Sequence, residues 1–156
     1  MEEGIIQLPI AAVDGRLKRE VVLAQMTRQE GQYVIRSIPG FAYGVGLDDV
    51  VKIVDPDSGQ FEIVSRSGQV AIRAFVEGPL DRPDVRALID AILSENGTYE
   101  AARSDEDVSL LLLSIHINLG LDKIRSLMKL VAGPDVQWEF GNIFDEDGNL
   151  VDWWVN

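Results

Sequence analysis

Ser114 and His116 are the residues whose types and spacing come nearest to a catalytic pair. They lie on one face of a strand predicted for Val108 to Ile117, two residues apart. Hydrolysis by such a pair also needs an orienting acid and an oxyanion hole, and no nucleophile elbow is present. With a single histidine and no cysteine, a zinc site is disfavoured as well. We therefore expect a hydrogen-bonded histidine in the core or at a strand end, and no enzyme.

A calcium loop is the second chemistry that the residue types suggest, because Asp145, Asp147 and Asn149 alternate. Such a loop needs glycine at its sixth position and glutamate at its twelfth. Leu150 stands at the sixth position, and no glutamate closes the loop. Because Asp-Gly is the strongest short hairpin signal, we predict a hairpin turn here, without a metal or other cofactor.

The segment Gly44-Val45-Gly46 resembles part of a dinucleotide fingerprint, which requires a preceding strand, a third glycine and a following helix. The β-branched residues Val50 and Val51 follow instead and favour a strand. We therefore expect the two glycines to permit a tight loop. Neighbouring Asp48 and Asp49 point to different faces if extended, so they do not form an acid and base pair. One of them is expected to close the loop.

The last 22 residues contain six carboxylates, no lysine or arginine, and all three tryptophans. Carboxylates steer the approach of a basic protein and aromatic side chains anchor it, so we predict a surface for a basic partner. Its residues are Asp145, Glu146, Asp147, Asp152, Trp153 and Trp154, together with Asp48 and Asp49. If the end of the chain is a strand, the two adjacent tryptophans face opposite sides, one inward and one outward.

The net charge of −12 opposes binding to nucleic acid and to anionic membranes, which require lysine and arginine. Met1 to Ala12 does not read as a signal peptide, and no apolar run reaches the roughly 20 residues of a membrane helix. The lack of cysteine fits a reducing compartment, so we expect a cytoplasmic protein. A hydrophobic fraction of 46% favours a compact fold.

Between Arg19 and Val76, short β-branched runs alternate with turn-forming residues, which is typical of a small barrel or a curled sheet. The predicted strands are 20–26, 33–38, 50–54, 61–64 and 70–76. Arg73 follows Ile72 in the last of these, and period-two alternation predicts that Arg73 faces solvent.

After Val76 the pattern changes to that of helices and strands in turn. A helix begins at Pro83 and ends before Asn96, and a second helix is bounded by Asn118 and Gly133. Strands are predicted at 98–103, 108–117, 136–144 and 150–155. Counted from residue 69, this is the split βαβ, ferredoxin-like order.

We therefore predict an α+β fold in which a small β-barrel-like unit, residues 1–68, packs closely on a ferredoxin-like unit, residues 69–156, with an acidic and aromatic C-terminal hairpin. The helices cover one face of the second sheet. Its other face must be covered by the N-terminal strands, by the hairpin or by a partner.

Residues 38–51 carry the skeleton P-x-x-x-Y-G-x-x-x-x-D-V-V, which is followed by Phe61, Gly68 and Arg73. This pattern resembles an uncharacterised bacterial family built on a domain of unknown function, over about Leu17 to Phe140. The resemblance implies no activity. By analogy, small acidic proteins of such families look like immunity proteins, which occlude a toxin.

Function is expected on these grounds to be non-enzymatic. The first hypothesis is an immunity protein that neutralises a bacterial toxin, such as a basic nuclease, by covering its active or substrate-binding surface. The alternative is a ferredoxin-like regulatory domain that binds a small ligand. The oligomeric state stays open.

Overall fold

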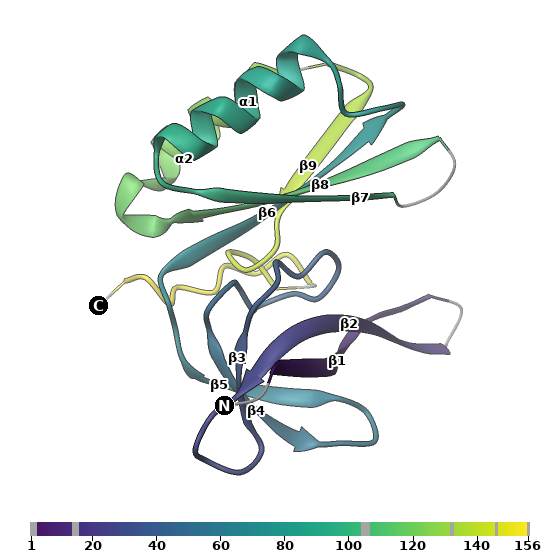
Figure 1. Cartoon of the computed structure of the whole chain (residues 1–156), viewed down its shortest axis with the longest axis vertical. Coiled ribbons are helices and arrows are strands. Elements are labelled where there is room, and N and C mark those ends of the chain that lie inside the picture. Colours follow the sequence, from purple (N-terminus) through teal and green to yellow (C-terminus); the bar gives the residue numbers. More distant parts are fainter. Residues whose placement is uncertain (1–2, 14–15, 104–106, 132, 146, 156) are drawn as a thin grey trace.

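The computed structural model describes residues 3–13, 16–103, 107–131, 133–145 and 147–155 (Figure 1). These residues form two antiparallel sheets and two short α-helices, with more strand than helix, so the chain is a mixed α+β protein. The two sheets are stacked along the longest axis of the molecule, and both helices lie on the outer side of the second sheet (Figure 1).

The first sheet has the strand order β1-β2-β3-β4-β5. Its strands are β1 (Glu3–Val13), β2 (Arg16–Met26), β3 (Gln32–Ile35), β4 (Val50–Asp55) and β5 (Gln60–Ser65). The sheet curls until its first and last strands meet, where a side chain at Gly59 would lie 2.5 Å from the Gln7 carbonyl oxygen. Strand β1 is not predicted from the sequence. Pro9 interrupts its pattern, and proline is tolerated because β1 is hydrogen-bonded to β2 alone among the strands described.

The second sheet has the order β7-β8-β6-β9. Its strands are β6 (Gln69–Glu77), β7 (Thr98–Arg103), β8 (Val108–His116) and β9 (Val136–Phe140). Helices α1 (Pro83–Ser94) and α2 (Leu121–Met128) cover one face, and short 3-10 turns η1 (Ile117–Leu119) and η2 (Lys129–Val131) flank α2. The main core lies between this face and the helices, and includes Ile72, Leu88, Ile92, Leu113 and Ile124.

Helix α1 begins and ends where the sequence predicts. Pro83 lies in its first turn, and the Asp84 carboxylate accepts a hydrogen bond from the Val85 N–H and pairs with Arg82. Val85, Leu88 and Ile92 form the buried stripe. Asn96 then adopts a φ of 64°, which ends the helix and turns the chain into β7.

The other face of the second sheet is covered by the segment between β3 and β4, residues 36–49, which we call the connecting loop. Ile38 packs between Ala71, Leu110 and Leu112. Figure 1 shows the connecting loop lying between the two sheets, next to the C-terminal segment drawn in yellow. The sequence left the N-terminal strands, the hairpin or a partner as possible covers; in the structure a loop between two of the N-terminal strands covers this face, rather than the strands themselves.

The C-terminal hairpin is shorter than predicted. Phe144 and Leu150 form one isolated bridge, and the residues after Leu150 form turns rather than a strand. The prediction that Trp153 and Trp154 face opposite sides is therefore wrong. Both side chains are half-buried against the main core, with their rings perpendicular and 5.5 Å apart.

Among the described residues, no helix combines the length and the apolar character that crossing a membrane requires.

Candidate functional site

The connecting loop is held by carboxylates from both sheets. Glu20 of β2 accepts hydrogen bonds from the backbone N–H groups of Gly40, Phe41 and Ala42, at 2.5, 3.0 and 2.8 Å. From the other side, Glu100 of β7 accepts the Ile38 N–H at 2.6 Å. Because buried N–H groups need acceptors, these two carboxylates determine where the loop runs. Its aromatic residues are thereby positioned against the second sheet.

Asp49 closes the connecting loop, as predicted for one member of the Asp48 and Asp49 pair. Its side chain is 1% exposed and accepts hydrogen bonds from the Gly46 N–H at 2.8 Å and the Ser67 N–H at 2.8 Å. Arg66 lies 3.4 Å away. Burial raises the pKa of Asp49 above its usual 3.8, although these donors and Arg66 act in the opposite direction. Asp49 is therefore a structural residue and does not belong to a partner-binding surface.

Arg73 is buried, which contradicts its predicted solvent exposure. Only 1% of the residue is exposed, since β6 is a central strand with helices on one face and the connecting loop on the other. Its guanidinium stacks under the Tyr43 ring, 4.5 Å from the ring centroid, and donates to the Ala42 carbonyl at 3.2 Å. Its Nε lies 3.0 Å from the Glu139 carboxylate, an ion pair without hydrogen-bond alignment. Burial lowers the pKa of Arg73, and Glu139 opposes that shift.

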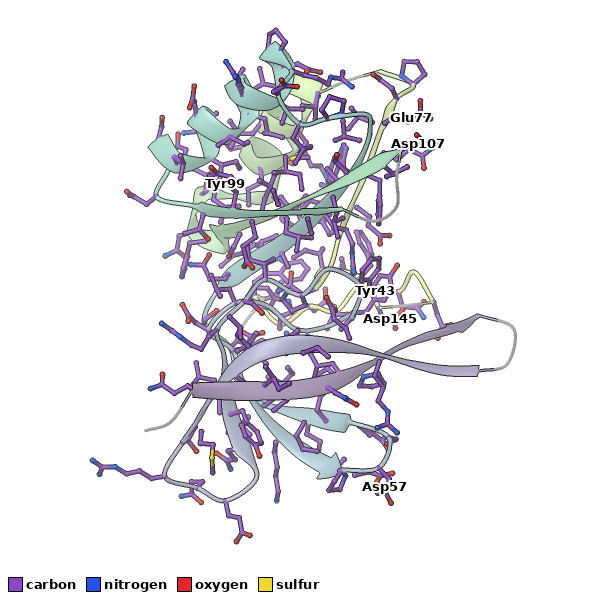
Figure 2. All side chains as sticks on the ribbon, turned by 45° about the vertical axis from the view of Figure 1, so that its right-hand side comes forward. Tyr43, Asp57, Glu77, Tyr99, Asp107 and Asp145 are labelled. Carbon is purple, nitrogen blue, oxygen red and sulfur yellow. The ribbon has the colours of Figure 1, made fainter. Side chains whose placement is uncertain are left out.

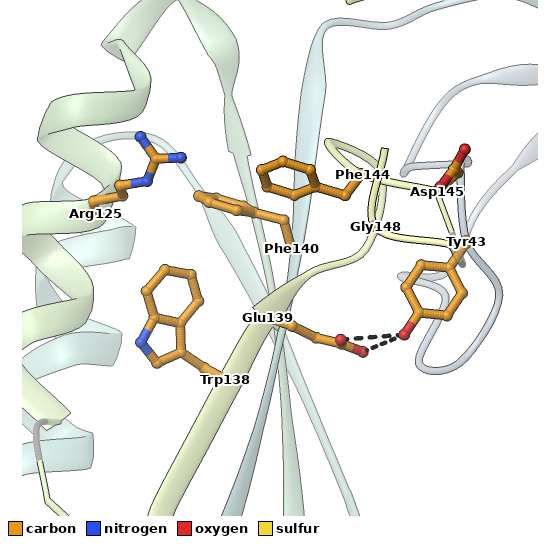
Figure 3. Close-up of a pocket in the computed structure, with 8 residues that line it drawn as sticks. All are labelled: Tyr43, Arg125, Trp138, Glu139, Phe140, Phe144, Asp145 and Gly148. Atoms are coloured by element: carbon orange, nitrogen blue, oxygen red, sulfur yellow. Dashed lines mark hydrogen bonds between the residues drawn. The ribbon is translucent and has the colours of Figure 1, made fainter. Parts of the chain in front are cut away.

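Tyr43 and Glu139 also meet in an open pocket of about 420 Å³ (Figure 3). The Tyr43 hydroxyl donates to the Glu139 carboxylate at 2.9 Å, and Figure 3 shows Glu139 reaching toward Tyr43 while Trp138 points the opposite way, toward α2. The full lining is Tyr43, Arg125, Trp138, Glu139, Phe140, Phe144, Asp145 and Gly148. Figure 2 places Tyr43 and Asp145 together at the level of the junction between the sheets.

Aromatic rings and two carboxylates give this pocket its chemistry. The centroid of the Phe140 ring lies 5.2 Å from that of Trp138, with the rings edge to face, and 6.5 Å from that of Phe144. Arg125 already lies over the Phe140 ring at 5.5 Å, so the aromatic wall accepts a cation in this structure. The pocket is therefore suited to an amphipathic group with a positive charge, such as a lysine or arginine side chain.

The acidic residues predicted for the C-terminal surface differ in how exposed they are. Asp147 and Asp152 are exposed, and within the described part of the chain their carboxylates form no hydrogen bond or ion pair. Asp145 is half-buried and holds the turn, since its carboxylate accepts the N–H groups of Asp147 at 3.0 Å and Asn149 at 2.9 Å. Glu146 lies outside the described residues.

Asp48 lies apart from the C-terminal group. It is exposed, and its carboxylate is 2.5 Å from Arg36 on the connecting loop. An exposed ion pair of this kind adds little to stability, and the role of Asp48 in binding a partner stays a prediction.

Trp153 and Trp154 hold the end of the chain against the rest of the molecule. The Trp153 indole N–H donates to the Asn142 carbonyl at 2.7 Å, and Arg66 lies over its ring at 5.3 Å. Because Arg66 also bonds the Gly44 carbonyl at 2.6 Å, it links the connecting loop to the C-terminal segment. Trp154 lines a separate shallow pocket with Leu121 and Lys123 at the start of α2.

Ser114 and His116 do not form a catalytic pair. The Ser114 hydroxyl donates to the Gln69 side chain at 2.7 Å, while His116 Nδ1 accepts the Asn118 N–H at 3.1 Å. His116 therefore caps the start of η1 at the end of β8. Within the described ranges, no group of three or more histidine or acidic side chains is placed to hold a metal ion.

The pocket is not predicted from the sequence, because its lining comes from three distant parts of the chain. Two signals were available. Arg73 occurs in an otherwise apolar strand, Val70 to Val76, and such a run is typical of a strand covered on both faces. The sequence pattern of residues 38–51, with Arg73 after it, also contains both Tyr43 and Arg73, and these two side chains stack in the structure.

Comparison with known families matches nearly the same residues as the resemblance seen in the sequence, about Leu17 to Phe140. Residues 20–140 match the family described as Domain of unknown function (DUF4265). The chain belongs to this family. The DUF4265 match begins at Glu20, whose carboxylate holds the connecting loop, and ends at Phe140, the last residue of β9. The acidic turn and the last two tryptophans follow the matched residues.

A crystal structure of a hypothetical protein from Neisseria gonorrhoeae is similar to the DUF4265 chain in fold. The TM-score is 0.65 with 17% sequence identity, and the alignment covers 90% of this chain and 95% of that chain. At this identity the similarity shows the fold alone. Among curated proteins, none matches the chain.

Proposed function

We propose that this protein is a non-enzymatic binding protein, located in the cytoplasm, that holds a basic protein partner at its C-terminal surface. The surface consists of the exposed Asp147 and Asp152 and the neighbouring pocket formed around Tyr43, Glu139 and Asp145. The observation that carries the proposal is the aromatic pocket with carboxylates at its wall, together with the exposed Asp147 in the turn whose Asp145 and Gly148 line it.

The class of partner that fits best is a toxin domain with a basic active surface, such as a nuclease, so that the protein acts as an immunity protein. A net charge of −12 would steer such a partner, and the C-terminal surface would occlude it. We also infer that the two sheets are a barrel-like unit, residues 1–68, and a ferredoxin-like unit, residues 69–156, which act as one body. Supporting this are the curled first sheet and the strand order β7-β8-β6-β9.

The test is capture of the partner from the native host with three forms of the tagged protein. The first is wild type, and the second is Asp147→Lys with Asp152→Lys. The third is a matched control, Asp57→Lys with Glu62→Lys, which makes the same charge change on the first sheet. Figure 2 shows Asp57 near the lower end of the molecule, beside the first sheet, and Asp145 at the junction between the sheets.

A basic protein should be retained by wild type and control, be lost in high salt, and be lost from the Asp147 and Asp152 variant. Mass spectrometry identifies the retained protein. Equal retention by all three forms would contradict the proposed surface.

The second candidate function is binding of a small regulatory ligand, which the pocket volume of about 420 Å³ favours because ligand pockets are commonly of this size. Screening metabolites for a rise in the melting temperature tests it. A ligand whose stabilising effect disappears in Phe144→Ala, with no protein captured from the host, would favour this candidate over the first.

A further inference from the structure

Strand β9 forms one edge of the second sheet and pairs with β6 alone among the described strands. Two hydrogen bonds show which of its backbone groups face β6. The Gly141 N–H donates to the Ala71 carbonyl at 2.8 Å, and the Glu77 N–H donates to the Asp135 carbonyl at 2.9 Å. In an antiparallel ladder every second residue bonds the neighbouring strand, so odd-numbered residues of β9 bond β6. The backbone groups of Trp138 and Phe140 therefore point away from the sheet.

The pocket lies along this edge, since Trp138, Glu139 and Phe140 line it in succession. Their side chains alternate across the edge, with Trp138 toward α2 and Glu139 toward Tyr43 (Figure 3). The Glu139 side chain is 45% exposed although it contacts Arg73 and Tyr43. An added strand would thus find backbone groups to pair with, an aromatic wall on one side and a carboxylate on the other.

We propose that the edge of β9 binds an extended basic segment of the partner as an additional strand of the second sheet. This inference rests on the proposed function and specifies how the partner is held. Main-chain hydrogen bonds to Trp138 would supply affinity. Lysine or arginine side chains of the segment would face Glu139 and Asp145, and apolar side chains would pack on the Trp138 side.

Charge decides against a second copy of this chain as the occupant. In a symmetric antiparallel pair of β9 strands centred on Trp138, Glu139 of one copy would lie diagonal to Glu139 of the other, and each copy carries a net charge of −12. Like charges opposite one another destabilise strand pairing, whereas a basic segment is attracted.

The test uses a synthetic hexapeptide of alternating lysine and valine, blocked at both ends, and amide hydrogen exchange of the full protein measured by NMR. In the free protein, the Trp138 amide should exchange faster than the Gln137 and Glu139 amides, which bond β6. Saturating peptide should slow exchange at Trp138 by about tenfold or more and leave Gln137 and Glu139 nearly unchanged. Two control peptides, one with N-methylated alternate amides and one with glutamate replacing lysine, should give no protection.

Protection at Trp138 that requires the free peptide amides supports strand addition. Peptide binding that shifts only Asp147 and Asp152, with unchanged exchange at Trp138, overturns strand addition while the acidic binding surface stands. Absence of peptide binding up to about 1 mM also overturns it. The capture experiment judges the proposed function separately, because it uses the partner itself.

Discussion

A single buried arginine joins the two halves of this molecule. Arg73 stacks under Tyr43 and meets Glu139 and the Ala42 carbonyl, so the connecting loop and β9 converge on its guanidinium. A cation and an aromatic ring removed from water attract each other by up to about 2 kcal/mol. The stack is therefore expected to be a main contribution of Tyr43 to stability.

Substitution of both partners tests this stack. In a cycle of Arg73→Met, Tyr43→Leu and the double variant, we expect a coupling energy of about 1–2 kcal/mol in the free energy of unfolding by urea. The control is Arg125→Met, whose guanidinium lies over Phe140 at the exposed surface and should cost less than about 1 kcal/mol. A coupling near zero would mean that the stack contributes nothing.

The adjacent aspartates of the connecting loop form a second matched pair of residues. Asp49→Ala leaves the buried N–H groups of Gly46 and Ser67 without their acceptor and should cost about 3 kcal/mol in urea denaturation. Asp48→Ala removes an exposed carboxylate and should change stability by less than about 0.5 kcal/mol. Equal effects would refute the structural role of Asp49.

The pH dependence of Asp49 has a definite sign. Its pKa in the folded protein is raised above 3.8, so the folded state takes up the proton first. The part of its contribution to stability that depends on protonation is complete below pH 3.8. This part decreases as the pH rises through the folded pKa. The difference between wild type and Asp49→Ala should therefore grow when the pH is lowered from about 7 to about 4.

At the scale of an element, the start of α1 depends on charge. Asp84 bonds the Val85 N–H and Arg82, and Arg82 holds the pKa of this carboxyl below its usual 3.8. Its contribution is therefore present above pH 3.8 and is lost as pH falls through the lower, folded pKa.

Asp84→Asn should accordingly reduce stability by about 0.5–1 kcal/mol at neutral pH and by less at about pH 3, below the usual pKa of 3.8. Thermal or urea unfolding followed by circular dichroism measures both values. Asp90→Asn, exposed in the middle of the same helix, is the control and should change little at either pH. A pH-independent loss at Asp84 would indicate a steric effect of the substitution.

At the scale of the whole molecule, the two sheets share a buried interface. Ile38 of the connecting loop is 3% exposed between Ala71, Leu110 and Leu112 of the second sheet. Because these residues would face water without the loop, we expect the two sheets to unfold together.

Truncation of this contact by Ile38→Ala should cost about 3 kcal/mol, and circular dichroism and tryptophan fluorescence should report one common transition. All three tryptophans pack on the second sheet, so fluorescence reports that half. Val21→Ala, at an exposed position of the first sheet, is the control and should be nearly neutral. Separate transitions for the two probes would contradict a shared interface.

The sequence by itself determined the local elements. Helix α1, most strands and the turn at Asp147-Gly148 follow from periodicity and from residues that permit tight turns, which act over a few neighbouring positions. The closing role of one of the two adjacent aspartates could also be predicted, because the glycines around them indicate a tight loop.

Only the tertiary structure decided what surrounds each side chain. Alternation placed Arg73 in solvent because a period of two gives the face on which a side chain lies and not what covers that face, and the connecting loop covers it. Trp153 and Trp154 came to one side because the chain turns there instead of extending. The pocket brings Tyr43 and Arg125 to β9 from distant positions, and burial and contact between such positions depend on the packing of the whole chain, which local patterns do not encode.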